Sequence, residues 1–442
     1  MTLFSRPTSE SAHLATPMET NPSSDRHLRT GGDPASSALL GEAIMDSVSS
    51  VCDSLPKEHR AHFETLRQEI IDFTEAHKIP RESLGKPDLL REATHKLSIQ
   101  DLERLALLLE RFEYLLKNGE PKEEKLPEYL QEIERLYRLR EQYDFQVSLL
   151  EQVGILKDKA ILGINGCKYP IPTLEQIAQK LYEQRETLET KRDQGFTKLL
   201  LVPFGMSLDG LAEILEQFLL SYKKSHPSFN LSLSQPLYRW RTYSATADAG
   251  NLPRLVYYPR SFTEYGHQGK IKRQILLERE EAWKQNLDDN SWKGWTVHLL
   301  QPSDPSNLDS KGFAPIPRKG HGTPQGDLVP RPPLEAGKTP NEYLSILQKA
   351  QEDEDSPYHG ETGMTPEDWI MAFMIHLAET EKPLDDYENG AEGSSLLTGA
   401  FFRFTVDVPV ACWFQSNSQA CLHIHIPDQR IWYTGVRSSV II

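Results

Sequence analysis

Val408-Pro-Val-Ala-Cys-Trp-Phe414 is the stretch that carries most of the information about the fold. Two related stretches follow it, Gln419-Ala-Cys-Leu-His-Ile424 and Gly435-Val-Arg437. Val, Ile, Phe and Trp favour strands, whereas the polar run from Phe414 to Ser418 is too polar for a buried strand. Val406, Val408 and Val410 alternate as the core side of a strand does. We therefore predict four strands near the C-terminus, at 401–406, 411–414, 420–424 and 435–442.

Helix starts precede these strands. Thr365-Pro-Glu-Asp368 and Thr339-Pro-Asn-Glu342 both combine a capping Thr with Pro in the first turn and an acidic residue three positions on. Residues 303–338 are rich in Pro, which indicates a linker or a long ordered loop. We predict a separate C-terminal domain at 339–442.

Helices alternate with short apolar strands in the segment before the prolines. Capping residues Thr173 and Ser207 begin two helices, a charged helix covers 270–286, and strands are expected at 198–204, 255–258 and 295–300. This pattern predicts a small α/β accessory domain at 155–302.

The N-terminal part is expected to be helical. Residues 53–154 carry helical patterns, including a stripe over 102–116 and a helix after Pro127, which can pair as a hairpin or small bundle. Residues 1–52 are rich in Ser, Thr, Pro and Gly and are predicted to be disordered. The fold class is α+β.

Composition limits the function classes. The chain has 442 residues, a length typical of two to three domains, and its 49 basic and 64 acidic side chains give a net charge of −15. This charge would repel a phosphate backbone, so we expect no nucleic-acid partner. We find no signal peptide and no long apolar run, and four cysteines do not form a disulfide framework. We expect a cytoplasmic protein without a membrane partner.

The sequence contains few candidate metal-binding, redox or catalytic side chains. His423 and His425 lie two apart on a strand and could hold a metal with Cys421 or Asp428, or could simply form contacts. Cys412 and Cys421 could form a redox pair across a hairpin, or be small buried hydrophobes. Two acidic groups, Asp385-Asp386 and residues 352–355, are expected to be solvated. No catalytic signature is found, so we predict no enzyme and no cofactor.

The closing stretch resembles a known family. The segments 408–413, 419–422 and 435–437, with Pro427-Asp428 between them, resemble the C-type lectin fold of the formylglycine-generating-enzyme type. Gly435-Val-Arg437 near the chain end is most similar to the variable target proteins of bacterial diversity-generating retroelements. The matched core covers about 35 residues, and the similarity extends to about 80 from Thr365. Residues 196–206 resemble an accessory region of such proteins, which are uncharacterised.

The resemblance implies a ligand-binding display protein with a C-type-lectin-like domain at 339–442. Scaffold positions would be Pro409, Ala411, Trp413, Gln419, Ala420, Leu422, Gly435 and Arg437, of which Trp413 is expected to be buried. The diversified ligand-binding residues, all of types reachable from an asparagine codon by changes at adenine, would be Phe414, Ser416, Asn417, Ser418, Cys421, His423, His425, Ile431 and Tyr433. The ligand would be a protein or a carbohydrate. The alternatives are a lectin-like carbohydrate-binding protein of fixed specificity and a copper/cysteine oxidase related to formylglycine-generating enzymes. The wider spacing of Cys412 and Cys421 makes oxidase activity doubtful.

Overall fold

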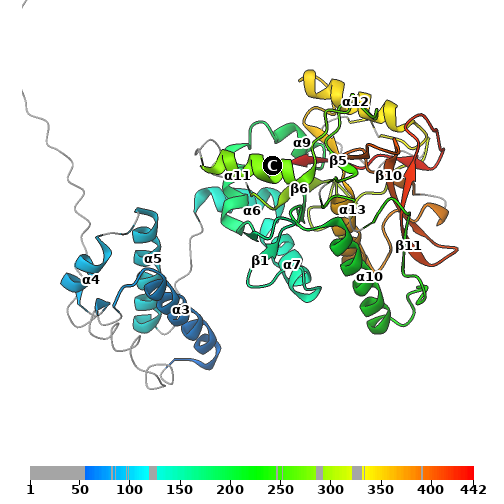
Figure 1. Ribbon diagram of the computed structural model, residues 1–442. Coiled ribbons are helices and arrows are strands. Elements are labelled where there is room, and N and C mark those ends of the chain that lie inside the picture. The colour runs from blue at the N-terminus through cyan, green and yellow to red at the C-terminus, as the bar shows by residue number, and fades with distance from the viewer. Residues whose placement is uncertain are drawn as a thin grey trace, which may run out of the picture. The chain divides into compact units, whose positions relative to one another are not determined.

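The chain has a mixed α+β fold in two compact units, Met1–Lys125 and Leu126–Ile442 (Figure 1). The structure is a computed structural model. It describes residues 55–442 apart from 81–82, 85, 96, 98, 119–126, 245–246, 251, 285–291, 321–330, 333 and 390–391. The N-terminal segment 1–52, predicted to be disordered, lies outside these residues.

The first unit contains three helices in its described part: α3 (Lys57–Ala76), α4 (Pro87–Thr94) and α5 (Ile99–Asn118). Helices α3 and α5 pack together through an apolar core in which the rings of Phe63 and Phe112 stack at 5.1 Å. The expected helix at 102–116 is confirmed as α5. The helix after Pro127, expected to pair with it, belongs to the second unit and buries its apolar stripe in the core of that unit.

The helices of the second unit begin largely where the sequence predicts them. Side chains of Thr173, Ser207, Thr339 and Thr365 each accept a hydrogen bond from a backbone N–H of the first turn. Such caps satisfy donors that the helix itself leaves free. The helices are α6 (Glu128–Tyr137), α7 (Leu139–Gln152), α8 (Leu174–Glu183), α9 (Glu189–Asp193), α10 (Leu208–Ser225), α11 (Lys272–Lys284), α12 (Pro340–Glu352) and α13 (Pro366–Thr380).

Two larger sheets form the second unit. An antiparallel sheet has the order β3 (Lys198–Val202), β6 (Thr296–Leu300), β13 (Ser438–Ile441) and β7 (Glu361–Gly363). A mixed sheet has the order β12 (Thr434–Gly435), β8 (Ser394–Leu396), β10 (Val408–Phe414), β11 (Gln419–His425) and β4 (Leu237–Arg239). Two small pairs complete the strands: β1 (Ala160–Leu162) with β2 (Lys168–Pro170), and β5 (Leu255–Tyr257) with β9 (Ala400–Phe402).

The predicted strand at 401–406 is shorter in the structure. Strand β9 ends at Phe402, and the backbone turns so that the Phe402 N–H donates to the Asp407 carbonyl. Val406 lies in the left-handed region with φ 57°, which interrupts a strand.

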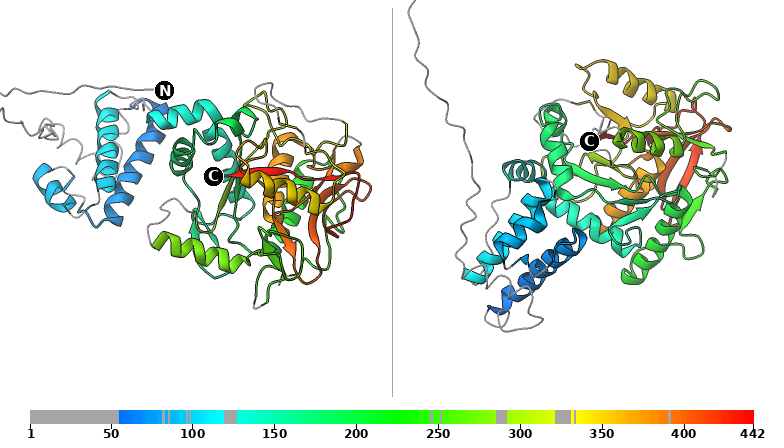
Figure 2. Two further views of the ribbon diagram at one scale, coloured as in Figure 1. Left: turned by 90° about the horizontal axis from the view of Figure 1, so that it is seen from above. Right: turned by 60° about the vertical axis from the view of Figure 1, so that its left-hand side comes forward.

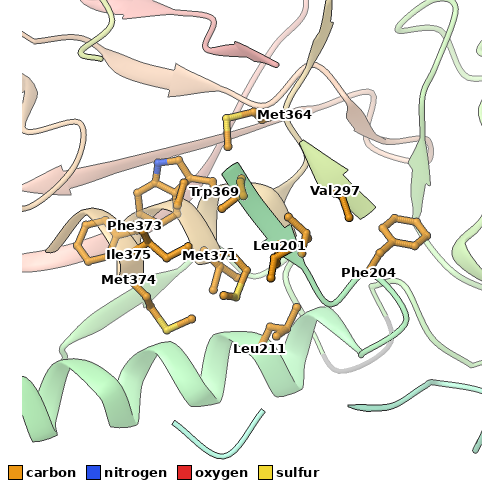
Figure 3. Close-up of a cluster of buried hydrophobic side chains, with 14 of the residues drawn as sticks. Leu201, Phe204, Leu211, Val297, Met364, Trp369, Met371, Phe373, Met374 and Ile375 are labelled. Carbon is orange, nitrogen blue, oxygen red and sulfur yellow. The ribbon is translucent and has the colours of Figure 1, made fainter. Parts of the chain in front are cut away.

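The accessory segment and the C-terminal segment are one unit, contrary to the expected boundary. The C-terminal strand β13 pairs with β6 of the middle segment, and β4 pairs with β11. Helix α13 packs its apolar residues between α10 and β3, so both segments share one core (Figure 3). Helix α12 lies beside β7, next to the C-terminal strand (Figure 2). Because these strands pair across the proline-rich segment, residues 339–442 do not form a separate domain.

The described part of the proline-rich segment is an ordered loop, one of the two predicted forms. Phe313, Ile316 and Leu334 are buried. Arg331 donates to both carboxylate oxygens of the buried Glu361, at 2.9 and 2.7 Å, and Glu361 also accepts from Lys191 at 2.7 Å. These contacts attach the loop to β7 and α9. Residues 321–330 lie outside the described part.

Candidate functional site

The hairpin of β10 and β11 separates two sets of side chains. Its register pairs Ala411 with Leu422 and Trp413 with Ala420, and these four are buried in the main core. Because successive strand residues point to opposite faces, the pairs Cys412–Cys421 and Val410–His423 point the other way. All eight expected scaffold positions, Pro409 to Arg437, are buried.

The Gly-Val-Arg motif has a direct packing role. A Cβ on Gly435 would lie 2.5 Å from the side chain of Ile316, so only glycine fits there without a shift. Arg437 donates to Asp385 Oδ1 at 2.5 Å and to the Ala314 carbonyl. Asp385 and Asp386 are therefore not solvated as predicted: they are 0% and 8% exposed, because the turn containing them packs against the chain end.

Strand β4 extends the outward side of the hairpin with aromatic rings. It runs parallel to β11 with Tyr238 opposite Cys421. The Trp240 ring lies 4.8 Å from His423, and the Tyr238 ring stacks on His423 at 6.2 Å. His425 follows at 6.4 Å from His423, and burial lowers the pKa of His425 to about 4. Its imidazole is therefore neutral at neutral pH.

A second aromatic group lies beside Cys412. Tyr387 stacks on Tyr433 at 4.6 Å and lies 5.8 Å from Phe414. Trp432, which is 65% exposed, meets Tyr433 edge-on at 5.3 Å. Burial raises the pKa of Tyr387, and the nearby thiols of Cys412 and Cys421 raise it further. We call the two groups together the aromatic face: Tyr238, Trp240, Tyr387, Phe414, His423, His425, Trp432 and Tyr433.

The nine predicted binding residues have different surroundings. Phe414, His423, His425 and Tyr433 belong to the aromatic face and are half-buried, and so is Ile431 in the following loop. Ser416 and Asn417 are exposed and Ser418 is half-buried in the hairpin turn. The Ser416 backbone N–H donates to Glu388 at 2.5 Å, which fixes this turn. Cys421 is only 8% exposed, so its expected display as an outward residue is wrong: neighbouring rings cover it.

Sequence reasoning missed half of the aromatic face. Tyr238 and Trp240 come from a segment far from the recognised motif, and the pairing of β4 with β11 brings them to the hairpin. Tyr387 lies within the extended similarity, in a turn for which no binding residue was predicted. Trp432 lies between two predicted residues, Ile431 and Tyr433. A large aromatic residue in a loop between two predicted binding residues could have indicated it.

Arg318 adds a positive charge at the rim. Its guanidinium lies 4.7 Å from the centre of the Trp432 ring, a cation–π contact. A cavity of about 300 Å³ opens at the turn end of the hairpin, next to Trp413 and Ser418. The aromatic face thus offers ring faces, two imidazoles and one guanidinium as binding groups.

A serine, a histidine and an aspartate in the core contact one another in the same sequence as the catalytic triad of a hydrolase. Ser439 Oγ is 2.9 Å from His298 Nδ1, and His298 Nε2 is 3.2 Å from Asp368 Oδ1. All three residues are at most 1% exposed. A nucleophile must reach its substrate, so these residues are better explained as a buried polar link between β13, β6 and α13. Sequence spacing could not find them.

The comparisons with known proteins give no relative: a scan of family models, a search of curated proteins and a search of solved structures found no match. In the part of the chain that the structure describes, no group of three or more His, Cys, Asp or Glu side chains is placed to hold a metal. In the same part, the helices are too short or too polar to cross a membrane. The cytoplasmic location and the absence of a nucleic-acid partner stay predictions.

Proposed function

We propose that the protein binds a protein or carbohydrate ligand on the aromatic face, and that this face is the diversified surface of a display protein. One observation carries the proposal. The β10–β11 hairpin buries Ala411, Trp413, Ala420 and Leu422 in the core, and most expected variable residues lie on its other side or in the turn. Such a division lets the variable residues change while the fold persists.

The chemistry of the face suits recognition. Aromatic side chains bury a large area at a small cost in conformational entropy, and serine, asparagine and histidine form adaptable hydrogen bonds. Ser416 and Asn417 lie exposed beside these rings. Binding by such a surface requires no covalent chemistry.

Libraries of variants test the proposal. One library randomises the codons of Phe414, Ser416, Asn417, His423 and Tyr433, and a matched library randomises the scaffold residues Pro409, Ala411, Trp413, Ala420 and Leu422. Both are displayed on phage and selected on streptavidin. We expect folded, streptavidin-binding clones from the first library only. Loss of folding in nearly all clones of the first library would contradict the proposal.

The genome distinguishes diversification from fixed specificity. Diversification predicts a reverse transcriptase gene nearby and a near-copy of the codons for about residues 408–437 that differs only at adenines. A complete genome without both would refute diversification. A lectin-like protein of fixed specificity would then be the better explanation, with the same aromatic face as its binding surface.

The oxidase alternative has less support. The pKa of the Cys412 thiol is raised well above its usual range by contact with Cys421 and by burial. A thiol with a raised pKa supplies less thiolate, which is the reactive form and the metal ligand.

A further inference from the structure

Cys412 and Cys421 lie directly opposite each other in the β10–β11 ladder. The adjacent pair Trp413–Ala420 does not bond across this ladder: the Trp413 N–H donates to Asp385 and the Ala420 N–H to Pro236. Since bonded and non-bonded pairs alternate in an antiparallel ladder, Cys412 and Cys421 form a bonded pair, with Cα atoms about 5.5 Å apart.

This separation suits a disulfide. Disulfide-bonded cysteines have Cα atoms between about 4.4 and 6.8 Å apart, with side chains that point toward each other. Residues directly opposite in a ladder point to the same face, and both cysteines are free thiols here. A cross-link needs rotation of both side chains and a small approach of the two strands, because Cβ atoms of a directly opposite pair lie about 4.5–5.5 Å apart and those of a disulfide about 3.5–4.5 Å.

The pair is also closer to solvent than the rest of the hairpin centre. Cys412 and Cys421 are 7% and 8% exposed, whereas Ala411 and Leu422 on the core side are fully buried. The rings of Tyr387 and Tyr433 lie beside the thiols. Small motions of these rings can let a reagent reach the thiols. A fully buried side chain on the core side has no such route.

We propose that Cys412 and Cys421 are a redox pair that interconverts between two thiols and an intramolecular disulfide by exchange with a low-molecular-weight disulfide such as oxidised glutathione. The raised pKa of Cys412 leaves little thiolate, so exchange is slow: one cysteine thiolate attacks the glutathione disulfide, forms a mixed disulfide and releases one glutathione. The second cysteine thiolate then attacks the protein sulfur of the mixed disulfide and releases the other glutathione. The two cysteines lose two electrons and two protons, and the oxidant becomes two glutathione thiols.

Oxidation would cross-link the two strands beneath the aromatic face and fix their register. This chemistry concerns two buried residues outside the aromatic face and does not depend on which ligand the face binds. Its test is therefore separate from the tests of ligand binding.

The test uses the full chain with Cys52→Ser and Cys167→Ser, which leaves only the pair. The protein is equilibrated natively with glutathione at stepped ratios of oxidised to reduced form, quenched with acid, unfolded and alkylated, and its intact mass is measured. We expect both thiols to disappear together without added glutathione mass. We also expect half-conversion at a ratio at least ~10-fold less oxidising than for the same chain in urea, because the fold holds the thiols together.

Single variants are the matched controls. With Cys412→Ser or Cys421→Ser added, the remaining thiol should stay free or carry one glutathione, while circular dichroism verifies folding. The proposal is overturned if both thiols of the folded parent stay alkylatable at the most oxidising ratio. Stable glutathione adducts on that parent, without closure of the disulfide, would overturn it as well.

Discussion

Arg437 donates a hydrogen bond to Asp385 at 2.5 Å, and both side chains are almost completely buried. Asp385 also accepts from the Trp369 indole at 2.8 Å, so the turn, helix α13 and the chain end meet at one carboxylate. Burial raises the pKa of Asp385, whereas the Arg437 guanidinium favours its charged form. The arginine of the terminal Gly-Val-Arg motif is thus a structural anchor.

Removal of the Asp385 charge should destabilise the fold strongly. Asp385→Asn keeps the shape and tolerates the φ of 60° at this position, yet it leaves the Arg437 charge buried without its counter-charge. We expect a loss of about 3–5 kcal/mol in the free energy of unfolding, measured with urea. The matched control Arg430→Ala breaks an exposed ion pair with Glu342 and should cost less than about 1 kcal/mol. Equal effects of the two variants would contradict the anchor role.

Two tryptophans of the C-terminal segment should respond in opposite ways. Trp413 is 3% exposed and packs against Phe373 and Phe229, whereas Trp432 is 65% exposed. Trp413→Ala should cost about 3–5 kcal/mol as a large-to-small change in the core. Trp432→Ala should stay within about 0.5 kcal/mol. A stable Trp413→Ala protein in urea unfolding would show that the register of the hairpin is wrong.

The shared sheet predicts that residues 339–442 do not separate from the middle segment. A specific protease site inserted directly after Gly320, which is exposed, should allow cleavage of the native chain. The two fragments should still elute together in size-exclusion chromatography, because β13 pairs with β6 and β11 with β4. A folded 339–442 fragment that elutes alone would support two domains instead.

His376 should make stability depend on pH. Burial, followed by the charges of Arg437, Lys198 and Lys382, lowers its pKa to about 3, and its Nδ1 accepts the Phe313 N–H at 2.9 Å. The unfolded chain binds a proton on His376 more tightly than the folded chain does. The stabilisation of the fold by neutral His376 is therefore complete above about pH 6.5 and is lost as the pH falls toward 3. Between these two pH values the free energy of unfolding should fall by about 1.4 kcal/mol for each unit by which the pH falls.

The variant His376→Gln isolates this effect. It keeps an acceptor but does not titrate in this range. Its unfolding free energy, measured in urea at several pH values, should fall less steeply than that of the parent below pH 6.5. Parallel curves for the two proteins would contradict the assignment.

Local signals predicted the local structure well. The caps at Thr173, Ser207, Thr339 and Thr365 depend on a few neighbouring residues, and all are present in the structure. The apolar runs at 198–202 and 296–300 are strands for the same reason, because each carries enough β-forming residues by itself.

Long-range pairing was not predictable from one sequence. The pairing of β13 with β6, and of β4 with β11, joins segments far apart in the chain, and no local property of Leu237 or Val440 indicates the partner strand. Asp385 illustrates the same limit. An acidic turn usually lies in solvent, and only the presence of Arg437 beside it explains its burial.

The aromatic face and the hairpin turn should contribute little to the stability of the fold, whereas the other side of the hairpin supports it. The most direct measurement is the urea unfolding free energy of one combined variant, with Ser416, Asn417, His423, His425 and Trp432 all replaced by Ala. We expect a folded protein that loses less stability than Trp413→Ala alone, which costs about 3–5 kcal/mol. A combined variant that is unfolded, or less stable than Trp413→Ala, would contradict it.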